Sequence, residues 1–234
     1  MPTALEKDYL KFKKEIEKSV KRLFKIESGV ETSFKKHHKS TYAIALILTK
    51  LESIVKEENK LIFLAEILSD VLTLTKLSFI GFETPSQIIL RRLIENFYNH
   101  IYYFDHSIEY AHLNAGRNEY FPMEKLKLYF DSHPVFFDRT DPTIKEYNSN
   151  LFKEYQELCK VVHSKGKDSM NLAKCLKDLR QEFDITELLN KVNNIELYIV
   201  YLLYKFHMEL KYTATEKNLI VGIVPIGKRS HLTE

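Results

Sequence analysis

Apolar residues recur at spacings of three and four positions along most of this chain, which is the period of an α-helix. The first such stretch follows Thr3, which has the spacing of a helix-initiating capping box with Glu6. Gly29 fits the stop position of the same helix, because glycine readily takes the left-handed conformation found there. The apolar face of this predicted helix consists of Tyr9, Phe12, Ile16, Val20, Leu23 and Phe24.

A polar stretch over residues 35–40 interrupts the apolar pattern and includes His37 and His38. We interpret the two histidines as part of a solvated loop, because every residue in this stretch is polar. The helical pattern resumes after it. It predicts one helix over residues 41–57 and another over residues 59–79.

Two further helix starts stand out in the second half of the chain. Residues Thr84–Gln87 form a second capping box, with Pro85 at the first helical position, where its missing N–H group is not needed. Asp141 followed by Pro142 indicates another start. Between them, residues 105–140 are rich in Tyr, His and Asn and predict short helices and loops. The longer helices expected in this half cover residues 85–104, 142–164, 169–183 and 186–212.

The end of the chain departs from the helical pattern. Residues 219–227 are apolar, rich in β-branched side chains, and broken by glycine and proline. This composition predicts a short strand, or an extended segment that lies on the bundle or on a partner.

Composition supports a helical fold for the rest of the protein. The 234 residues include only 6 Gly and 6 Pro, which is fewer turn residues than an all-β fold needs. We therefore predict an all-α protein, a single bundle of seven or eight helices with an apolar C-terminal tail. Residues 1–80 would form its N-terminal helices, residues 84–212 its helical core and residues 213–234 the tail.

Several features indicate a cytoplasmic protein that does not enter a membrane. The 2 cysteines, Cys159 and Cys175, stand in no zinc-binding or disulfide-rich pattern, and isolated thiols are typical of a reducing compartment. The N-terminus is too charged for the apolar centre of a signal peptide. The most apolar stretch, residues 195–206, carries two charged residues and is 12 residues long, whereas a membrane span needs roughly 20.

The small positive net charge is unevenly distributed. Residues 1–40 hold 11 Lys and Arg against 6 Asp and Glu, and the remainder holds 24 against 26. A basic N-terminal patch of this kind can contact phosphate backbones. The more usual meaning of such a charge run is a solvated, lysine-rich helix face.

Common catalytic motifs are absent from the sequence. There is no Gly-rich phosphate loop, no His-Glu-x-x-His, no Cys-x-x-Cys pair and no Gly-x-Ser-x-Gly. These absences argue against common NTPases, dinucleotide enzymes, zinc enzymes and serine hydrolases. We expect no metal and no cofactor, and chemistry that depends on Arg, His, Glu and Tyr.

One polar constellation fits such chemistry. Arg91, Glu95 and Asn99 are spaced four apart on the helix from Pro85, so we expect them to stack on one face. Tyr155 and His163 are placed in the same way on the helix from Pro142, with Cys159 between them. If the two helices are neighbours, these polar faces converge. The candidate catalytic residues are Arg91, Glu95, Tyr155 and His163.

The surroundings of His163 suit contact with phosphate. It lies at the end of its predicted helix, where the helix dipole favours a protonated imidazole, and a general acid or base there can work near neutral pH. Lys165 and Lys167 follow at once and are candidate nucleic-acid-binding residues, together with Asn99 and Arg117. Arg117 stands in an aromatic-rich stretch, and aromatic side chains can stack on bases, although such residues more often form core.

These residues also carry a resemblance. Residues 90–96, LRRLIEN, and residues 155–164, YQELCKVVHS, resemble a pattern found in uncharacterised helical bacterial proteins, Leu-Arg-x-x-x-Glu on one helix and Tyr-x-x-Leu-Ser-x-x-x-His on another. Such proteins are associated with phage defence and abortive infection, and are distantly similar to the HEPN superfamily of helical ribonucleases and toxins. The resemblance implies functional roles for Arg91, Glu95, Tyr155 and His163.

Two departures from the pattern accompany the match. Cys159 stands where the pattern has Ser, and the Arg-x4–6-His signature of HEPN ribonucleases is absent, since His100 follows Arg92 after seven residues. Three functions therefore stay open. The protein is an effector acting on nucleic acid, a nucleic-acid-binding protein without catalysis, or a non-enzymatic adaptor, antitoxin or complex subunit.

The third function would use the tail to dock on a protein partner or on a second copy of the chain. A simpler structural explanation of the polar residues also exists, because a buried Arg–Glu pair with a Tyr and a His is a normal way to satisfy polar groups between helices.

Overall fold

The computed structural model describes residues 28–80, 82–117, 121–137, 141–162 and 185–233. Within these ranges the chain forms ten α-helices and no strand, and eight of the helices have seven residues or more. This confirms the predicted all-α bundle. The helices expected over residues 3–29 and 169–183 belong mainly to segments outside the described ranges.

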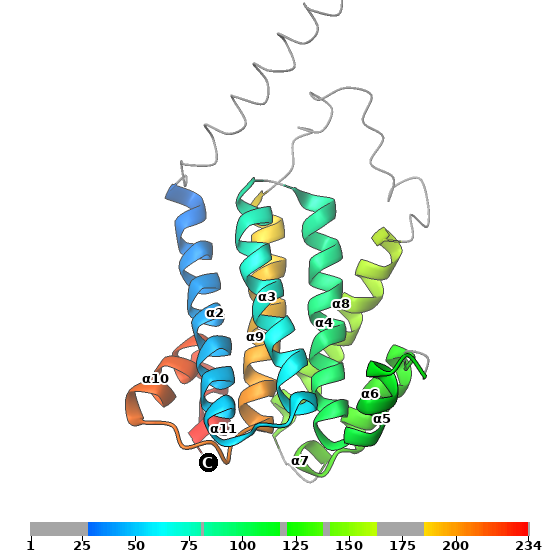
Figure 1. The fold of residues 1–234 in the computed structure, drawn as a ribbon. Helices are drawn as coiled ribbons and strands as arrows, with labels where there is room; N and C mark the ends of the chain where they lie inside the picture. The colour runs from blue at the N-terminus through cyan, green and yellow to red at the C-terminus, as the bar shows by residue number, and fades with distance from the viewer. Residues whose placement is uncertain (1–27, 81, 118–120, 138–140, 163–184, 234) are drawn as a thin grey trace, which may run out of the picture.

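The long helices run side by side along one common axis (Figure 1). The last of them in the chain, α9, lies among the others and contacts all four. It carries apolar residues on most of its surface, as expected of a helix that is buried on nearly every side. The long helices in the described ranges are α2 (Ser28–Ile54), α3 (Glu58–Ile80), α4 (Glu83–Asp105), α8 (Pro142–Val162) and α9 (Ile185–Phe206).

The middle of the chain forms short helices, as predicted. These are α5 (Ser107–Asn114), α6 (Met123–Ser132) and α7 (Pro134–Phe137), and they lie at one end of the bundle (Figure 1). α6 packs against α4 and buries Leu126 and Phe130 in the interface. This places α6 beside the two helices that carry the candidate site.

The C-terminal tail is helical, so the prediction of a strand or an extended segment is wrong. It forms α10 (Ala214–Ile223), a 3-10 turn (Ile226–Lys228) and α11 (Ser230–Thr233). Thr213 and Glu216 form a capping box that starts α10. Ile220 is fully buried where α10 packs on α2 and α9, and Val224 and Leu232 are buried as well, whereas Ile226 is 80% exposed.

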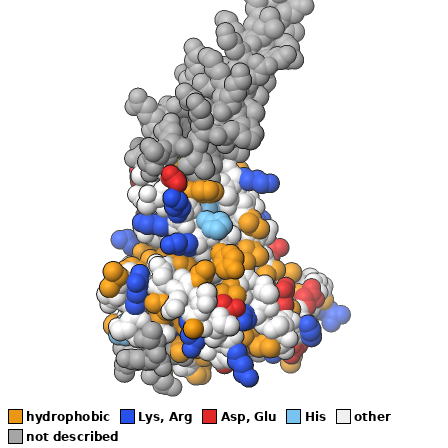
Figure 2. Space-filling model, turned by 90° about the vertical axis from the view of Figure 1, so that its left-hand side faces the viewer, with side chains coloured by type: hydrophobic (Ala, Val, Ile, Leu, Met, Phe, Trp, Pro, Cys, Tyr) orange, Lys and Arg blue, Asp and Glu red, His pale blue; other side chains and the backbone are white. Residues whose placement is uncertain are grey.

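α2 passes without a break through residues 35–40, so the prediction of a solvated loop is wrong. The stretch belongs to the helix because Ser33, His37 and Ser40 are buried at helical spacing although they are polar. Gly29, expected to end an earlier helix, lies in the first turn of α2. The other face of α2 is exposed and carries lysine side chains and His38, and Figure 2 shows this basic face.

The helix boundaries agree with some sequence signals and not with others. α8 begins at Pro142, and the Asp141 carboxylate caps it by accepting the backbone N–H of Thr143 at 2.9 Å, as predicted. The capping box expected at Thr84 is wrong, because α4 already begins at Glu83 with no side-chain cap.

One core joins the described parts of the chain. Buried apolar residues from all long helices and from the tail belong to a single cluster, with α9 supplying the largest share. α2 and α3 therefore share their interior with α4, α8 and α9. Among the described residues, none of the helices is both long enough and apolar enough to cross a bilayer.

Candidate functional site

α4 and α8 pack against each other, as the candidate site requires (Figure 1). Their contact includes a buried hydrogen bond of 2.5 Å from the Tyr98 hydroxyl on α4 to the side-chain oxygen of Asn148 on α8. Because the helices are neighbours, the polar residues of α4 and those of α8 can meet along one seam.

Three of the four candidate catalytic residues come together at this seam. The Arg91 guanidinium donates to the Glu95 carboxylate at 2.7 Å, and both side chains are about a quarter exposed, 26% and 27%. The same guanidinium lies over the Tyr155 ring, with 5.8 Å between its central carbon and the ring centroid. Such a cation–π contact across two helices fixes the arginine above the aromatic ring.

The electrostatics keep these groups in defined protonation states. Burial works to lower the pKa of Arg91, but the Glu95 charge and the Tyr155 hydrogen bond outweigh it and raise that pKa. Burial is also the largest cause that raises the pKa of Tyr155, followed by the neighbouring Cys159 thiol. At neutral pH, Arg91 is therefore a cation and Tyr155 a neutral hydroxyl that can donate a hydrogen bond.

The seam continues towards α6 through two residues that sequence reasoning missed. The Phe152 ring lies 6.1 Å from the Tyr155 ring, with 30° between their planes. The Lys127 ammonium lies 5.5 Å from the Phe152 ring centroid. We call Arg91, Tyr155, Phe152 and Lys127 the cation–aromatic row; all four side chains are partly exposed.

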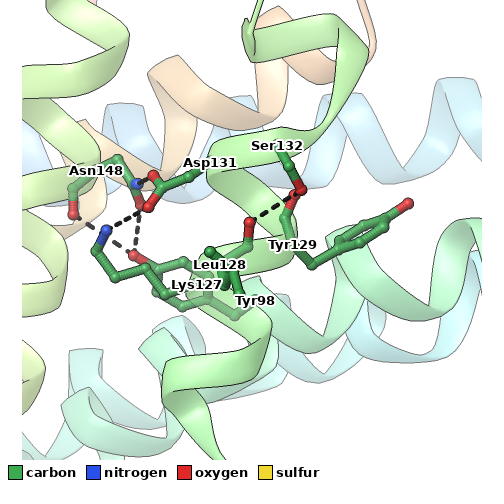
Figure 3. Close-up of polar contacts among 7 residues, drawn as sticks. All are labelled: Tyr98, Lys127, Leu128, Tyr129, Asp131, Ser132 and Asn148. Atoms are coloured by element: carbon green, nitrogen blue, oxygen red, sulfur yellow. Dashed lines mark hydrogen bonds and ion pairs between the residues drawn. The ribbon is translucent and has the colours of Figure 1, made fainter.

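Lys127 is held in place by a polar network, which Figure 3 shows in close-up. Its ammonium pairs with Asp131 at 2.5 Å, and Asp131 accepts the Asn148 amide at 2.7 Å. Asn148 in turn accepts the buried Tyr98 hydroxyl. The network connects α4, α6 and α8, and therefore fixes the lysine relative to the rings on α8.

The structure does not place all of the remaining predicted residues. His163, Lys165 and Lys167 lie outside the described residues, since the description of α8 ends at Val162. Arg117 is exposed just beyond α5. Their proposed roles stay predictions.

Asn99 does not share the solvent-facing side of Arg91 and Glu95, and this part of the prediction is wrong. Its side chain is 1% exposed, and neither amide atom has a hydrogen-bond partner among the described residues. The physical reason is helix geometry, because eight residues at 3.6 per turn leave Asn99 about 80° around the helix from Arg91. A side chain buried in this way is not available to a nucleic acid at the surface.

A second polar contact, also missed from the sequence, lies inside the bundle. The His37 Nδ1 atom on α2 is 2.7 Å from the Glu196 carboxylate on α9, and both side chains are buried. The Nε2 atom is 2.6 Å from the Thr75 hydroxyl on α3. Since that hydroxyl donates to the Val71 carbonyl at 3.0 Å, it accepts the N–H of His37. The contact therefore connects three helices.

Burial dominates the chemistry of this contact. It raises the pKa of Glu196, and the contact with His37 opposes the shift only in part. The second carboxylate oxygen of Glu196 has no hydrogen-bond partner in the part of the chain that the structure describes. The only sequence signal for it is a charged residue, Glu196, in the most apolar helix of the protein.

A pair of buried histidines forms a third polar contact within the core. The Nε2 atoms of His100 and His207 lie 2.9 Å apart, so one imidazole donates and the other accepts. Burial lowers the pKa of both imidazoles, which are therefore neutral near pH 7. Within the described residues, no group of three or more His, Cys, Asp or Glu side chains is placed to hold a metal ion.

Comparison of the chain with protein-family models, with curated proteins and with solved structures gave no match.

Proposed function

We propose that this protein is an effector that acts on nucleic acid, of the kind associated with bacterial defence, and that the seam between α4 and α8 contacts the phosphate backbone. Arg91 is the residue that carries this proposal. Its guanidinium is oriented by Glu95 from one side and by Tyr155 from the other, and it still reaches solvent. An arginine held in this way suits the recognition of a phosphate oxygen.

A second observation concerns the donors of Arg91. The Nε–H group of Arg91 is buried and has no hydrogen-bond partner among the described residues. Buried polar groups are nearly always hydrogen-bonded, because an unsatisfied donor loses its hydration without compensation. This unsatisfied donor is shielded from solvent, so we propose that a phosphate oxygen contacts the exposed part of the guanidinium instead.

In the proposed chemistry, each residue has a separate part. Arg91 stabilises the charge on the phosphate, Glu95 orients Arg91, and the protonated Tyr155 hydroxyl donates a hydrogen bond. His163, the residue that follows α8 in the sequence, would act as the general acid and base. Lys165 and Lys167 would neutralise neighbouring phosphates.

Controlled expression in bacterial cells tests the proposal. Wild-type protein is expected to arrest growth and to shorten cellular RNA or DNA, and Arg91→Gln and His163→Ala are expected to relieve both effects. Lys60→Gln is the matched control, because Lys60 also pairs with a glutamate of its own segment, Glu57, and also lies over an aromatic ring, that of Phe104, but away from the seam. Each variant must accumulate to the wild-type level.

Two results would reject the effector. One is growth arrest that persists unchanged in His163→Ala and Arg91→Gln. The other is wild-type protein that binds and degrades no nucleic acid under any condition in which it is folded. Either would favour the non-enzymatic adaptor, although the tail proposed as its docking element packs on its own bundle.

A further inference from the structure

The cation–aromatic row contains two similar units, each made of a cation, a carboxylate four residues later on the same helix, and an aromatic ring of α8. On α4, Arg91 is held by the carboxylate four residues later, and on α6, Lys127 is held in the same way by Asp131. Each cation lies over one of the two rings that α8 brings to the seam. Two aromatic rings therefore stand between two positioned cations that come from different helices.

The charges of this row rule out binding by electrostatics alone. Each cation is neutralised by a carboxylate within hydrogen-bonding distance, so the four charged groups sum to zero. Proteins that hold duplex nucleic acid through its backbone use many unpaired cations in a line. A ligand at this seam must gain a large part of its binding free energy from the aromatic rings.

The rings are suited to that task because they are rigid and partly exposed. Tyr155 and Phe152 pack against the hydrophobic core on one side and reach solvent on the other. Only unpaired bases can offer their faces to such rings, since the bases of a duplex are stacked on each other.

We propose that the cation–aromatic row binds single-stranded nucleic acid, with an unpaired base against Phe152 and Tyr155 and with flanking phosphates at Arg91 and Lys127. This inference rests on the proposed function and names its substrate class. Asp131 positions Lys127 through the network that reaches into the core at Tyr98 (Figure 3).

Fluorescence anisotropy with the full chain tests the inference. The probes are a labelled 12-nucleotide RNA, a DNA of the same mixed sequence, and the duplex of each. Wild-type protein is expected to bind the single strands at least ten-fold more tightly than the duplexes, because stacking on aromatic side chains contributes about 1–3 kcal/mol per base. The RNA and DNA arms show which of the two single strands is preferred.

A matched pair of variants separates the ring from general packing. Phe152→Leu keeps an apolar side chain but removes the ring, and is expected to weaken single-strand binding about ten-fold. Phe121→Leu is the control, because Phe121 is also partly buried and also has a lysine, Lys125, 5.9 Å from its ring centroid. It should leave binding within two-fold of the wild type, and circular dichroism should show both variants folded.

Salt dependence tests the two cations. Two phosphate contacts predict that the logarithm of the single-strand association constant falls with the logarithm of salt concentration with a slope of about −1.4. Lys127→Gln should reduce the size of this slope by about half. Lys125→Gln on the same helix should not change it.

The outcomes distinguish this inference from the function on which it rests. Equal binding of single strand and duplex, or equal effects of Phe152→Leu and Phe121→Leu, would overturn the stacking site. If Arg91→Gln still weakened binding in that case, the proposed function would stand alone. No binding of any probe by folded wild-type protein would overturn both.

Discussion

Arg91–Glu95 and His37–Glu196 are the same kind of contact, a basic side chain and a glutamate with 2.7 Å between nitrogen and oxygen. The first joins two residues of one helix and is about a quarter exposed. The second joins α2 to α9 and is closed to solvent. The two pairs therefore differ in interaction energy although their distances are equal. Water competes for the atoms of the first pair, whereas the second pair is shielded from water.

The difference lies in the desolvation of the charges. An exposed ion pair contributes about 0–1 kcal/mol, since water and salt screen it. A buried pair costs several kcal/mol to desolvate, and that loss is recovered only while both partners are present. Burial accordingly raises the pKa of Glu196, whereas the partly exposed Arg91 stays a firm cation. One contact is suited to meeting a ligand and the other to holding helices together.

The largest expected effect is the removal of His37. His37→Ala leaves the Glu196 carboxylate buried without its partner, and should lower the free energy of unfolding by about 3–5 kcal/mol. Urea unfolding followed by circular dichroism measures it. His38→Ala, one residue along and exposed, should change that free energy by less than about 0.5 kcal/mol. Similar losses in both variants would show that the contact of His37 with Glu196 does not contribute to the free energy of unfolding.

Replacing both partners should restore much of that loss. The double variant His37→Leu, Glu196→Leu removes the unpaired charge, and buried pairs replaced by apolar residues are often neutral or more stable. A double-mutant cycle on the free energy of unfolding should therefore give a large coupling energy. Additive losses in the two single variants would contradict this account of the buried pair.

The buried pair of His100 and His207 makes the stability of the protein depend on pH. The pKa values of His100 and His207 are lowered from 6.5 mainly by burial, so the unfolded chain binds more protons than the folded one below about that pH. Stability contributed by these residues is thus fully present above pH 6.5 and is lost as the pH falls below it.

Urea unfolding at pH 7.5 and 5.5 measures this loss. His100→Gln retains a hydrogen-bonding group but cannot titrate, and should lose less stability between the two pH values than the wild type. An unchanged difference would exclude the histidine pair as its source.

The smallest effect on stability should come from the seam. Glu95→Gln is expected to change the free energy of unfolding by less than about 1 kcal/mol, because the pair with Arg91 is exposed to water. The same variant should weaken binding of single-stranded nucleic acid if Glu95 orients the guanidinium. If Glu95→Gln instead lowered stability strongly and left binding unchanged, the pair of Arg91 and Glu95 would be a contact that stabilises the fold and not one that binds a ligand.

Sequence reasoning succeeded where a signal is local. The cap at Asp141 was found because its hydrogen bond reaches only to Thr143. The pair of Arg91 and Glu95 was found because residues four apart meet on any helix. Reasoning by helical spacing failed for Asn99, where the small mismatch between four residues and one turn accumulates over two steps.

Sequence reasoning also failed where a tertiary contact reverses a local preference. Its polar neighbours suggested that His37 lies in a solvated loop. The histidine is buried instead, in hydrogen-bonding contact with Glu196, 159 positions away. The β-branched tail was expected to extend, but its capping box and the burial of Ile220 favour a helix. The contact between Lys127 and Phe152 could not be predicted from the sequence, because only the packing of α6 beside α8 brings the two residues together.

The sequence by itself determined that this protein is helical, where α3, α4, α8 and α9 begin to within two residues, and that α4 and α8 carry polar residues at helical spacing. These properties depend on periodicity and capping within a few residues of each other. The tertiary structure alone decided which polar groups are buried and which rings meet which cations. Those outcomes depend on residues far apart in the chain, and on how much water their packing leaves between them.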